Sequence, residues 1–252
     1  MMAAMGFMPL SLANVSGDMP SFRYELRVHE QHAPAEGTLC IAGIDEVGRG
    51  PLAGPVVAAV AVIDRGVAKR KLLRLIDDSK KLVREERETA YDAMIASGCV
   101  RFAVGEASVE EIDTVNILQA TFLAMRRALA GLTEGRPDIV LIDGNRVPPE
   151  LGCRAETIVG GDARSYSIAA ASIFAKVTRD RYMYRLAEEF PGYGWETNVG
   201  YKSPAHFRAL KALGPTPHHR RSFAPVRACL GEPLVGELGP AEALAIAEEM
   251  ND

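Results

Sequence analysis

The apolar residues of this chain fall in short runs that predict β-strands. Five runs have the length and the β-branched or alternating composition of strands. They are residues 39–46, 56–63, 99–105, 138–143 and 156–159. A weaker alternation at residues 22–28 predicts an additional edge strand near the start.

Longer amphipathic or Ala-rich segments predict helices between and after these strands. They are residues 83–97, 108–130, 164–190, 204–213 and 241–250. Ser108 and Glu111 have the spacing of a capping box at the start of the second helix, and Gly98 is suited to end the first. Consecutive early strands followed by alternating strands and helices predict an α/β fold with a mixed sheet flanked by helices.

A Gly/Pro-rich segment, residues 191–197, predicts a boundary after the longest helix. We therefore expect four parts along the chain. They are a flexible leader (1–21), the sheet domain (22–190), a smaller C-terminal helical region (191–230) and an acidic tail with a short helix (231–252).

Composition narrows the class of protein. The chain has 252 residues, 48% of them hydrophobic, and no stretch of 18 uncharged apolar residues that would predict a membrane span. No Lys or Arg precedes Arg23, so a secretory signal is not expected. The four cysteines form no C-x-x-C pair, which argues against zinc and disulfides and favours a reducing compartment. We expect a cytoplasmic monomer without membrane contact.

The net charge of −4 conceals an uneven distribution. Residues 162–227 hold eleven Lys and Arg against five Asp and Glu, whereas residues 231–252 hold six acids and no cation. Such asymmetry favours a polyanionic partner for the basic segment. A basic face that is merely solvated is the alternative.

Three aspartates follow apolar runs where an active site is expected. Asp45 and Asp143 each end a predicted strand, and Asp162 precedes the longest helix. In an open α/β sheet, sites lie beyond the carboxyl ends of the strands. Carboxylates gathered there repel one another unless a cation neutralises them, and oxygen ligands suit Mg²⁺ or Mn²⁺. Taken singly, each aspartate is better explained as a strand end or a helix cap.

The stretch "GIDEVGRGP" places Glu46 beside Asp45 and then a glycine-rich turn. Adjacent strand residues point to opposite faces, so a shared site requires a bend, which we expect between Glu46 and Gly48. Glycines also let backbone N–H groups approach a ligand, and Arg49 suits a phosphate.

Six motifs in order resemble those of bacterial ribonuclease HII, the type 2 ribonuclease H family. They are "GIDEVGRGPLAGPVVAAVAV", "DSKKL", "LIDGN", "GDARSYSIAAASIFAKVTRD", "GYKSPAHF" and "HHRRSF", spread over residues 40–230. The resemblance implies a ribonuclease H-like sheet with a C-terminal helical segment. It also implies cleavage of the RNA strand in RNA–DNA hybrids and incision 5′ to single ribonucleotides in duplex DNA, leaving a 5′-phosphate.

The resemblance also assigns roles to residues. It implies that Asp45, Glu46, Asp143 and Asp162 are catalytic and hold Mg²⁺ or Mn²⁺, with a two-metal mechanism. It implies that the backbone of Gly48, Arg49 and Gly50 reads the ribose 2′-OH and that Tyr201 stacks on the next sugar. The expected phosphate contacts are Lys80, Lys81, Lys176 and Arg179.

Two other functions remain possible from the sequence. One is a non-catalytic module that binds RNA–DNA hybrids, although a binder gains nothing from mutually repelling acids. The other is a nucleotide-binding enzyme that uses the glycine loop, but the preceding acids would repel a pyrophosphate.

Overall fold

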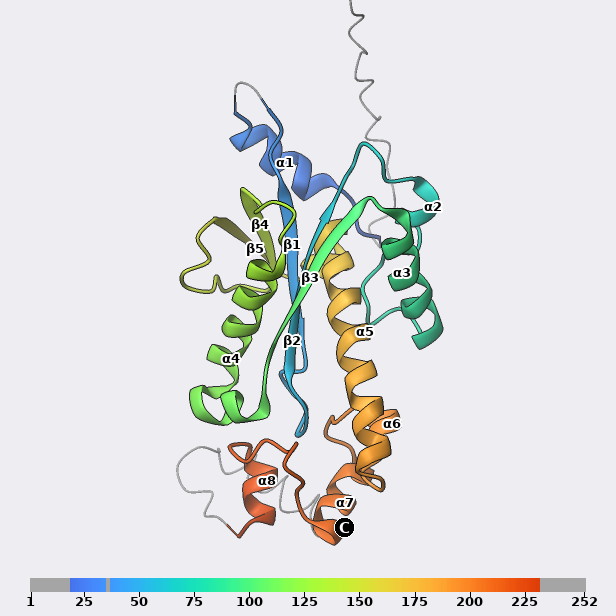
Figure 1. Cartoon of the computed structure of the whole chain (residues 1–252), viewed down its shortest axis with the longest axis vertical. Helices are drawn as coiled ribbons and strands as arrows, with labels where there is room; N and C mark the ends of the chain where they lie inside the picture. The colour runs from blue at the N-terminus through green and yellow to red at the C-terminus, as the bar shows by residue number, and fades with distance from the viewer. Residues whose placement is uncertain (1–18, 35–36, 232–252) are drawn as a thin grey trace, which may run out of the picture.

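The computed structural model describes residues 19–34 and 37–231. Most of the expected leader lies outside the described residues. The acidic tail and its expected helix also lie outside them, except for residue 231. One five-stranded sheet has the order β3-β2-β1-β4-β5 (Figure 1). Its strands are β1 (Ile41–Val47), β2 (Val56–Ile63), β3 (Val100–Ala107), β4 (Ile139–Asp143) and β5 (Arg154–Ile158). The five runs predicted as strands are thus confirmed.

The strand directions confirm the mixed sheet. β1 pairs antiparallel with β2, which makes one hairpin, and β2 pairs antiparallel with β3 across a longer connection, residues 64–99. β1 also pairs in parallel with β4, and β4 with β5. The change from antiparallel to parallel pairing therefore falls on β1, the central strand.

Helices cover both faces of the sheet. They are α1 (Arg23–His32), α2 (Arg70–Leu73), α3 (Arg84–Ser97), α4 (Val109–Gly131), the 3-10 turn η1 (Gly161–Ala163), α5 (Tyr166–Glu189), α6 (Trp195–Asn198), α7 (Pro204–Leu213) and α8 (Ala224–Cys229). α4 lies on one face, and α3 and α5 lie on the other (Figure 1). α5 approaches β1 so closely that a Cβ on Gly43 would lie 2.1 Å from the backbone of Ser167. A glycine is therefore required there.

The edge strand expected at residues 22–28 is wrong, because this segment starts α1. The buried residues of α1 are Glu25 and Val28, three apart as on one face of a helix. The Oε1 atom of Glu25 accepts hydrogen bonds from Ser165 Oγ at 2.7 Å and from Ser167 N at 3.0 Å, at the start of α5. A long-range polar contact therefore outweighs the local alternation.

The segment after α5 folds back on the loop between β1 and β2. α6, α7 and α8 gather at the end of the molecule opposite to α1 and α2 (Figure 1). Ala53 shares an apolar cluster with Trp195, and Leu52 shares another with Phe207. The loop from Gly48 to Pro55 is thus enclosed by the C-terminal part of the chain.

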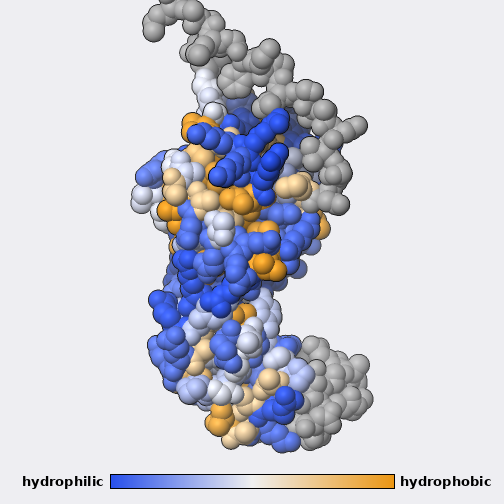
Figure 2. Space-filling view, turned by 90° about the vertical axis from the view of Figure 1, so that its right-hand side faces the viewer, coloured by the Kyte–Doolittle hydropathy of each residue, from blue (hydrophilic) through white to orange (hydrophobic). Residues whose placement is uncertain are grey.

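The face that carries α3 and α5 is mainly hydrophilic, with small, separate hydrophobic patches (Figure 2). Within residues 19–34 and 37–231, no helix is both long and apolar enough to cross a membrane.

Candidate active site

Strand register brings the first two aspartates together. β1 and β4 run in parallel with Ile44 beside Ile142, so the next residues, Asp45 and Asp143, are neighbours. Both isoleucines pack in the cluster under α4. Because side chains alternate along a strand, both aspartates turn to the opposite face, where α5 lies.

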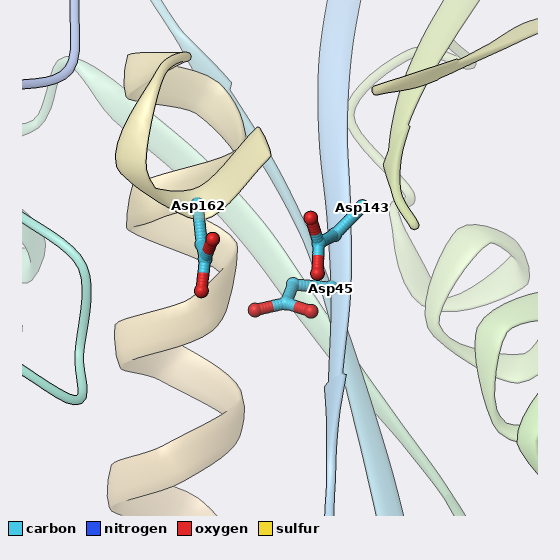
Figure 3. A group of neighbouring side chains, drawn as sticks. All are labelled: Asp45, Asp143 and Asp162. Carbon is cyan, nitrogen blue, oxygen red and sulfur yellow. The ribbon is translucent and has the colours of Figure 1, made fainter. Parts of the chain in front are cut away.

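Asp162 reaches the same place from the turn before α5. It belongs to η1, which follows Gly160 in the left-handed region at φ 64°. The N–H of Gly161 donates to Asp143 Oδ1 at 2.7 Å and so joins this turn to β4. Figure 3 shows the carboxylate of Asp162 directed at those of Asp45 and Asp143 across the gap between α5 and the sheet. One oxygen from each of the three lies within 4.8 Å of the others.

Burial and repulsion by neighbouring carboxylates raise the pKa values of Asp45 and Asp143. The pKa of Asp45 is raised well above its usual value, first by burial and then by the charges of Glu46, Asp143 and Asp162. Burial and the charge of Asp162 likewise raise the pKa of Asp143. The folded protein therefore holds Asp45 and Asp143 in an arrangement that opposes their ionisation.

The donor set fits a hard divalent cation. Asp45, Asp143 and Asp162 supply only oxygen ligands, without sulfur or imidazole, as Mg²⁺ and Mn²⁺ prefer. A cation would also offset the repulsion that raises the pKa values of Asp45 and Asp143.

Lys80, from the segment "DSKKL", already supplies one positive charge. Its Nζ lies 2.9 Å from Asp162 Oδ2. Partial burial acts to lower the pKa of Lys80, but the hydrogen bond to Asp162 and the nearby carboxylates raise it overall. Lys80 was expected to contact a phosphate, and the structure places its ammonium group at the edge of the carboxylate cluster.

Glu46 is not in the group of three. The strand pairing of β1 continues through Val47, and the positive φ of 92° comes only at Gly48. The expected bend thus lies beyond Glu46, whose carboxylate instead pairs with Arg49 Nη1 at 3.2 Å. Burial raises the pKa of Glu46, while Arg49 opposes the shift. A catalytic role for Glu46 stays a prediction.

Other expected substrate residues lie close to one another at the loop after β1. Arg49 and Gly50 are exposed. A Cβ on Gly50 would lie 3.8 Å from the ring of Tyr201, so loop and ring are neighbours. Lys176 Nζ lies 5.8 Å from the centre of the same ring and pairs with Asp180 at 2.8 Å.

Two of the proposed phosphate contacts have partners within the protein; the phosphate contact of Lys81 stays a prediction, whereas the burial of Arg179 argues against such a contact. Lys81 Nζ lies 3.7 Å from Asp77 Oδ1, in the turn beside α3. Arg179 is fully buried, and its guanidinium nitrogens donate to backbone carbonyls rather than facing the surface. The helical spacing of Lys176 and Arg179 predicted that both lie on one face of α5. It did not predict that the Arg179 side chain is buried.

Two other polar residues at the site had no assigned role from the sequence. Ser172, on α5, hydrogen-bonds to Asp45 and lies 2.6 Å from Ser79 Oγ. Arg220 is fully buried beneath the loop. The signal for Ser172 was present, since it is a polar residue in the apolar stretch "IAAASIF". For Arg220, the sequence did not distinguish a buried side chain from an exposed one.

Comparison with known proteins agrees with this geometry. The family model described as ribonuclease HII matches residues 42–226. Ribonuclease HII of Rhodospirillum rubrum is 59% identical over 190 residues, which cover 75% of this chain and 86% of that protein. Ribonuclease HII of Paracoccus denitrificans is 54% identical over 201 residues, covering 80% and 92%. The crystal structure of ribonuclease H2 from Pyrococcus horikoshii OT3 superposes with a TM-score of 0.62 at 29% identity, covering 75% of this chain and 96% of that one.

Proposed function

The chain belongs to the ribonuclease HII family, and from this premise we propose that it cleaves the RNA strand of RNA–DNA hybrids and incises duplex DNA 5′ to a single ribonucleotide. The products are a 3′-hydroxyl and a 5′-phosphate. The observation that supports this most directly is the meeting of Asp45, Asp143 and Asp162 within 4.8 Å at one end of the central strands. Neither a passive binding module nor a dinucleotide site accounts for such a cluster.

The three aspartates are the residues that would hold divalent metal, with Glu46 completing the set. Bound Mg²⁺ or Mn²⁺ would supply an activated water and stabilise the charge that develops on the leaving 3′ oxygen. The chain's part is to hold the carboxylates in fixed positions. The sheet register fixes Asp45 and Asp143, and the hydrogen bond from Gly161 to Asp143 fixes the turn that carries Asp162.

Substrate selection is assigned to the loop after β1 and to Tyr201. The exposed backbone of Arg49 and Gly50 lies next to the Tyr201 ring, which is 38% exposed. A sugar stacked on this ring would bring its neighbour's 2′-OH to the loop, and this group is what distinguishes RNA from DNA. Carboxylates and loop would thus act on the same nucleotide step.

Replacing Asp143 by Asn tests the reaction. The variant removes one charged ligand while keeping an oxygen that can accept from Gly161. We expect cleavage of a duplex with one ribonucleotide to fall at least about 10³-fold, with folding unchanged. The measurement is gel-resolved cleavage with Mg²⁺ and with Mn²⁺, beside circular dichroism.

The matched control is Asp92→Asn, which changes an exposed carboxylate on α3. It should cleave as the wild type does. Full activity of Asp143→Asn would refute the assignment of the site. Wild-type cleavage of an all-DNA duplex as fast as of the single-ribonucleotide duplex would refute the role of the loop.

A further inference from the structure

Two fully buried arginines cross-link the loop from Gly48 to Pro55. The first is Arg179, on α5. Its Nε donates to the carbonyl of Pro55 at 3.0 Å, and its Nη2 donates to that of Ala53 at 2.9 Å. Its Nη1 donates to Val199 O at 2.9 Å, which attaches the segment before Tyr201 to the same side chain.

The second buried arginine is Arg220, which approaches the loop from the C-terminal segment. Its Nε donates to the carbonyl of Gly54 at 2.9 Å, and its Nη1 donates to that of Arg49 at 3.0 Å. Its Nη2 donates to the carbonyls of Gly48 and Gly54. Between them, the two guanidinium groups bind the carbonyls at both ends of the loop.

Neither guanidinium group has a carboxylate within ion-pair distance among the described residues. Burying an unpaired charge is costly, and here only backbone carbonyls compensate for it. Burial lowers the pKa of Arg220, and the charge of Arg179 lowers it further. Simple cross-linking of a loop does not require two such charges, because neutral donors would satisfy the same carbonyls.

The consequence for the loop is a fixed orientation of its peptide groups. The carbonyls of Gly48 and Arg49 are drawn inward to Arg220. Within the described part of the chain, no acceptor binds the N–H of Arg49 or of Gly50, and both residues are exposed. The N–H groups of Arg49 and Gly50 therefore face away from the protein interior, next to Tyr201.

The packing leaves the loop little freedom to adopt another shape. Gly48 has a φ of 92°, and a Cβ there would lie 2.2 Å from Arg179 Nε. The guanidinium carbon of Arg179 also lies 5.8 Å from the centre of the Tyr201 ring. One side chain therefore supports both the glycine turn and the stacking surface.

We infer that Arg179 and Arg220 are positioning residues for ribose discrimination, which hold the backbone N–H groups of Arg49 and Gly50 in place to bind a 2′-OH. This inference rests on the proposed function and extends it to two residues that do not touch the substrate. Preorganised donors bind a ligand group without an ordering cost, so loss of the support should weaken recognition of the ribose specifically.

The test is a ratio of two dissociation constants. Arg220→Lys keeps the charge but loses the planar fork that binds separate carbonyls. In an Asp143→Asn background, fluorescence anisotropy gives the Kd of an all-DNA duplex and that of the same duplex with one ribonucleotide. The ratio of interest is the Kd of the all-DNA duplex divided by the Kd of the single-ribonucleotide duplex. We expect Arg220→Lys to lower this ratio about fivefold or more. Arg181→Lys, an exposed arginine on α5 paired with Glu88, is the matched control and should leave the ratio unchanged.

The ratio separates positioning from mere stability. A lower folded fraction reduces the amount of active protein but shifts both constants equally. A folded Arg220→Lys protein with an unchanged ratio would overturn the inference, while wild-type cleavage of the single-ribonucleotide duplex would still support the proposed function. If the wild type showed no metal-dependent cleavage, the proposed function itself would be refuted.

The wild-type protein provides a second test that does not depend on how a variant folds. A loop held by two guanidinium groups should be rigid before substrate binds. Backbone ¹⁵N relaxation should then give order parameters of about 0.8 or higher for residues 48–50 and 52–54, the non-proline residues of the loop. Values below about 0.6 would show a flexible loop and overturn the inference.

Discussion

Asp45 lies buried at the end of the central strand, where burial and three neighbouring carboxylates raise its pKa. The folded state therefore binds a proton more readily than the unfolded chain, whose Asp pKa is about 3.9. As pH rises from about 4 through the raised pKa of Asp45, the metal-free protein should lose stability.

Replacing Asp45 by Asn should raise the Tm of the protein in EDTA at pH 7.5, because the amide cannot ionise. A gain of about 1 kcal/mol in the free energy of unfolding would raise the Tm by about 2–4 °C. The difference should vanish below about pH 3, where the carboxyl group is protonated in both states. Scanning calorimetry across this pH range is the measurement. A lower Tm for Asp45→Asn at pH 7.5 would contradict the account, and Asp92→Asn should show no such pH-dependent gain.

At the scale of elements, α1 stabilises the start of α5. Glu25 accepts hydrogen bonds from Ser165 Oγ and Ser167 N, and Ser165 caps α5 by accepting from Ile168 N. Asp162 lies three residues before this cap. α1 lies outside residues 42–226, which match the family model, so this contact adds to the common fold.

Glu25→Ala should lower the free energy of unfolding by about 1–3 kcal/mol, since it leaves buried donors without an acceptor. Urea denaturation followed by circular dichroism measures the change. Glu30→Ala, an exposed position on the same helix, is the control and should stay within about 0.5 kcal/mol of the wild type. Equal stability of the two variants would show that the contact does not hold α5.

At the scale of the whole molecule, the structure divides the basic segment into three kinds of cation. Arg179 and Arg220 are buried in the interior, and Lys176 and Arg181 pair with acids. The remaining exposed cations include Lys202, next to Tyr201. Only exposed cations can release counterions from a duplex.

Lys202→Gln should therefore weaken binding of the all-DNA and the single-ribonucleotide duplex to the same degree. It should also reduce the slope of log K against log salt by about 1. Titrations at several salt concentrations measure both effects. Lys71→Gln, on α2 at the other end of the molecule (Figure 1), should leave the slope unchanged. A change confined to the ribonucleotide duplex would contradict a phosphate role for Lys202.

The sequence by itself determined the five strands, the helices α3, α4, α5 and α7, and the three aspartates, because these depend on local patterns. Apolar runs of strand length, the cap at Ser108 and acids at strand ends need no knowledge of distant residues. The family motifs added the loop and Tyr201. The alternation at residues 22–28 predicted a strand, but this segment starts the helix α1. There Glu25 accepts a hydrogen bond from Ser165, which lies 140 residues away in the sequence.

Only the tertiary structure decided what each charged side chain faces. Strand register turned Asp45 and Asp143 to α5, and the late turn at Gly48 left Glu46 beside Arg49. Burial turned Arg179 from an expected phosphate contact into a support for the loop. Local sequence encodes where a strand or helix runs, but the depth and partner of a side chain depend on elements that meet only when the chain has folded.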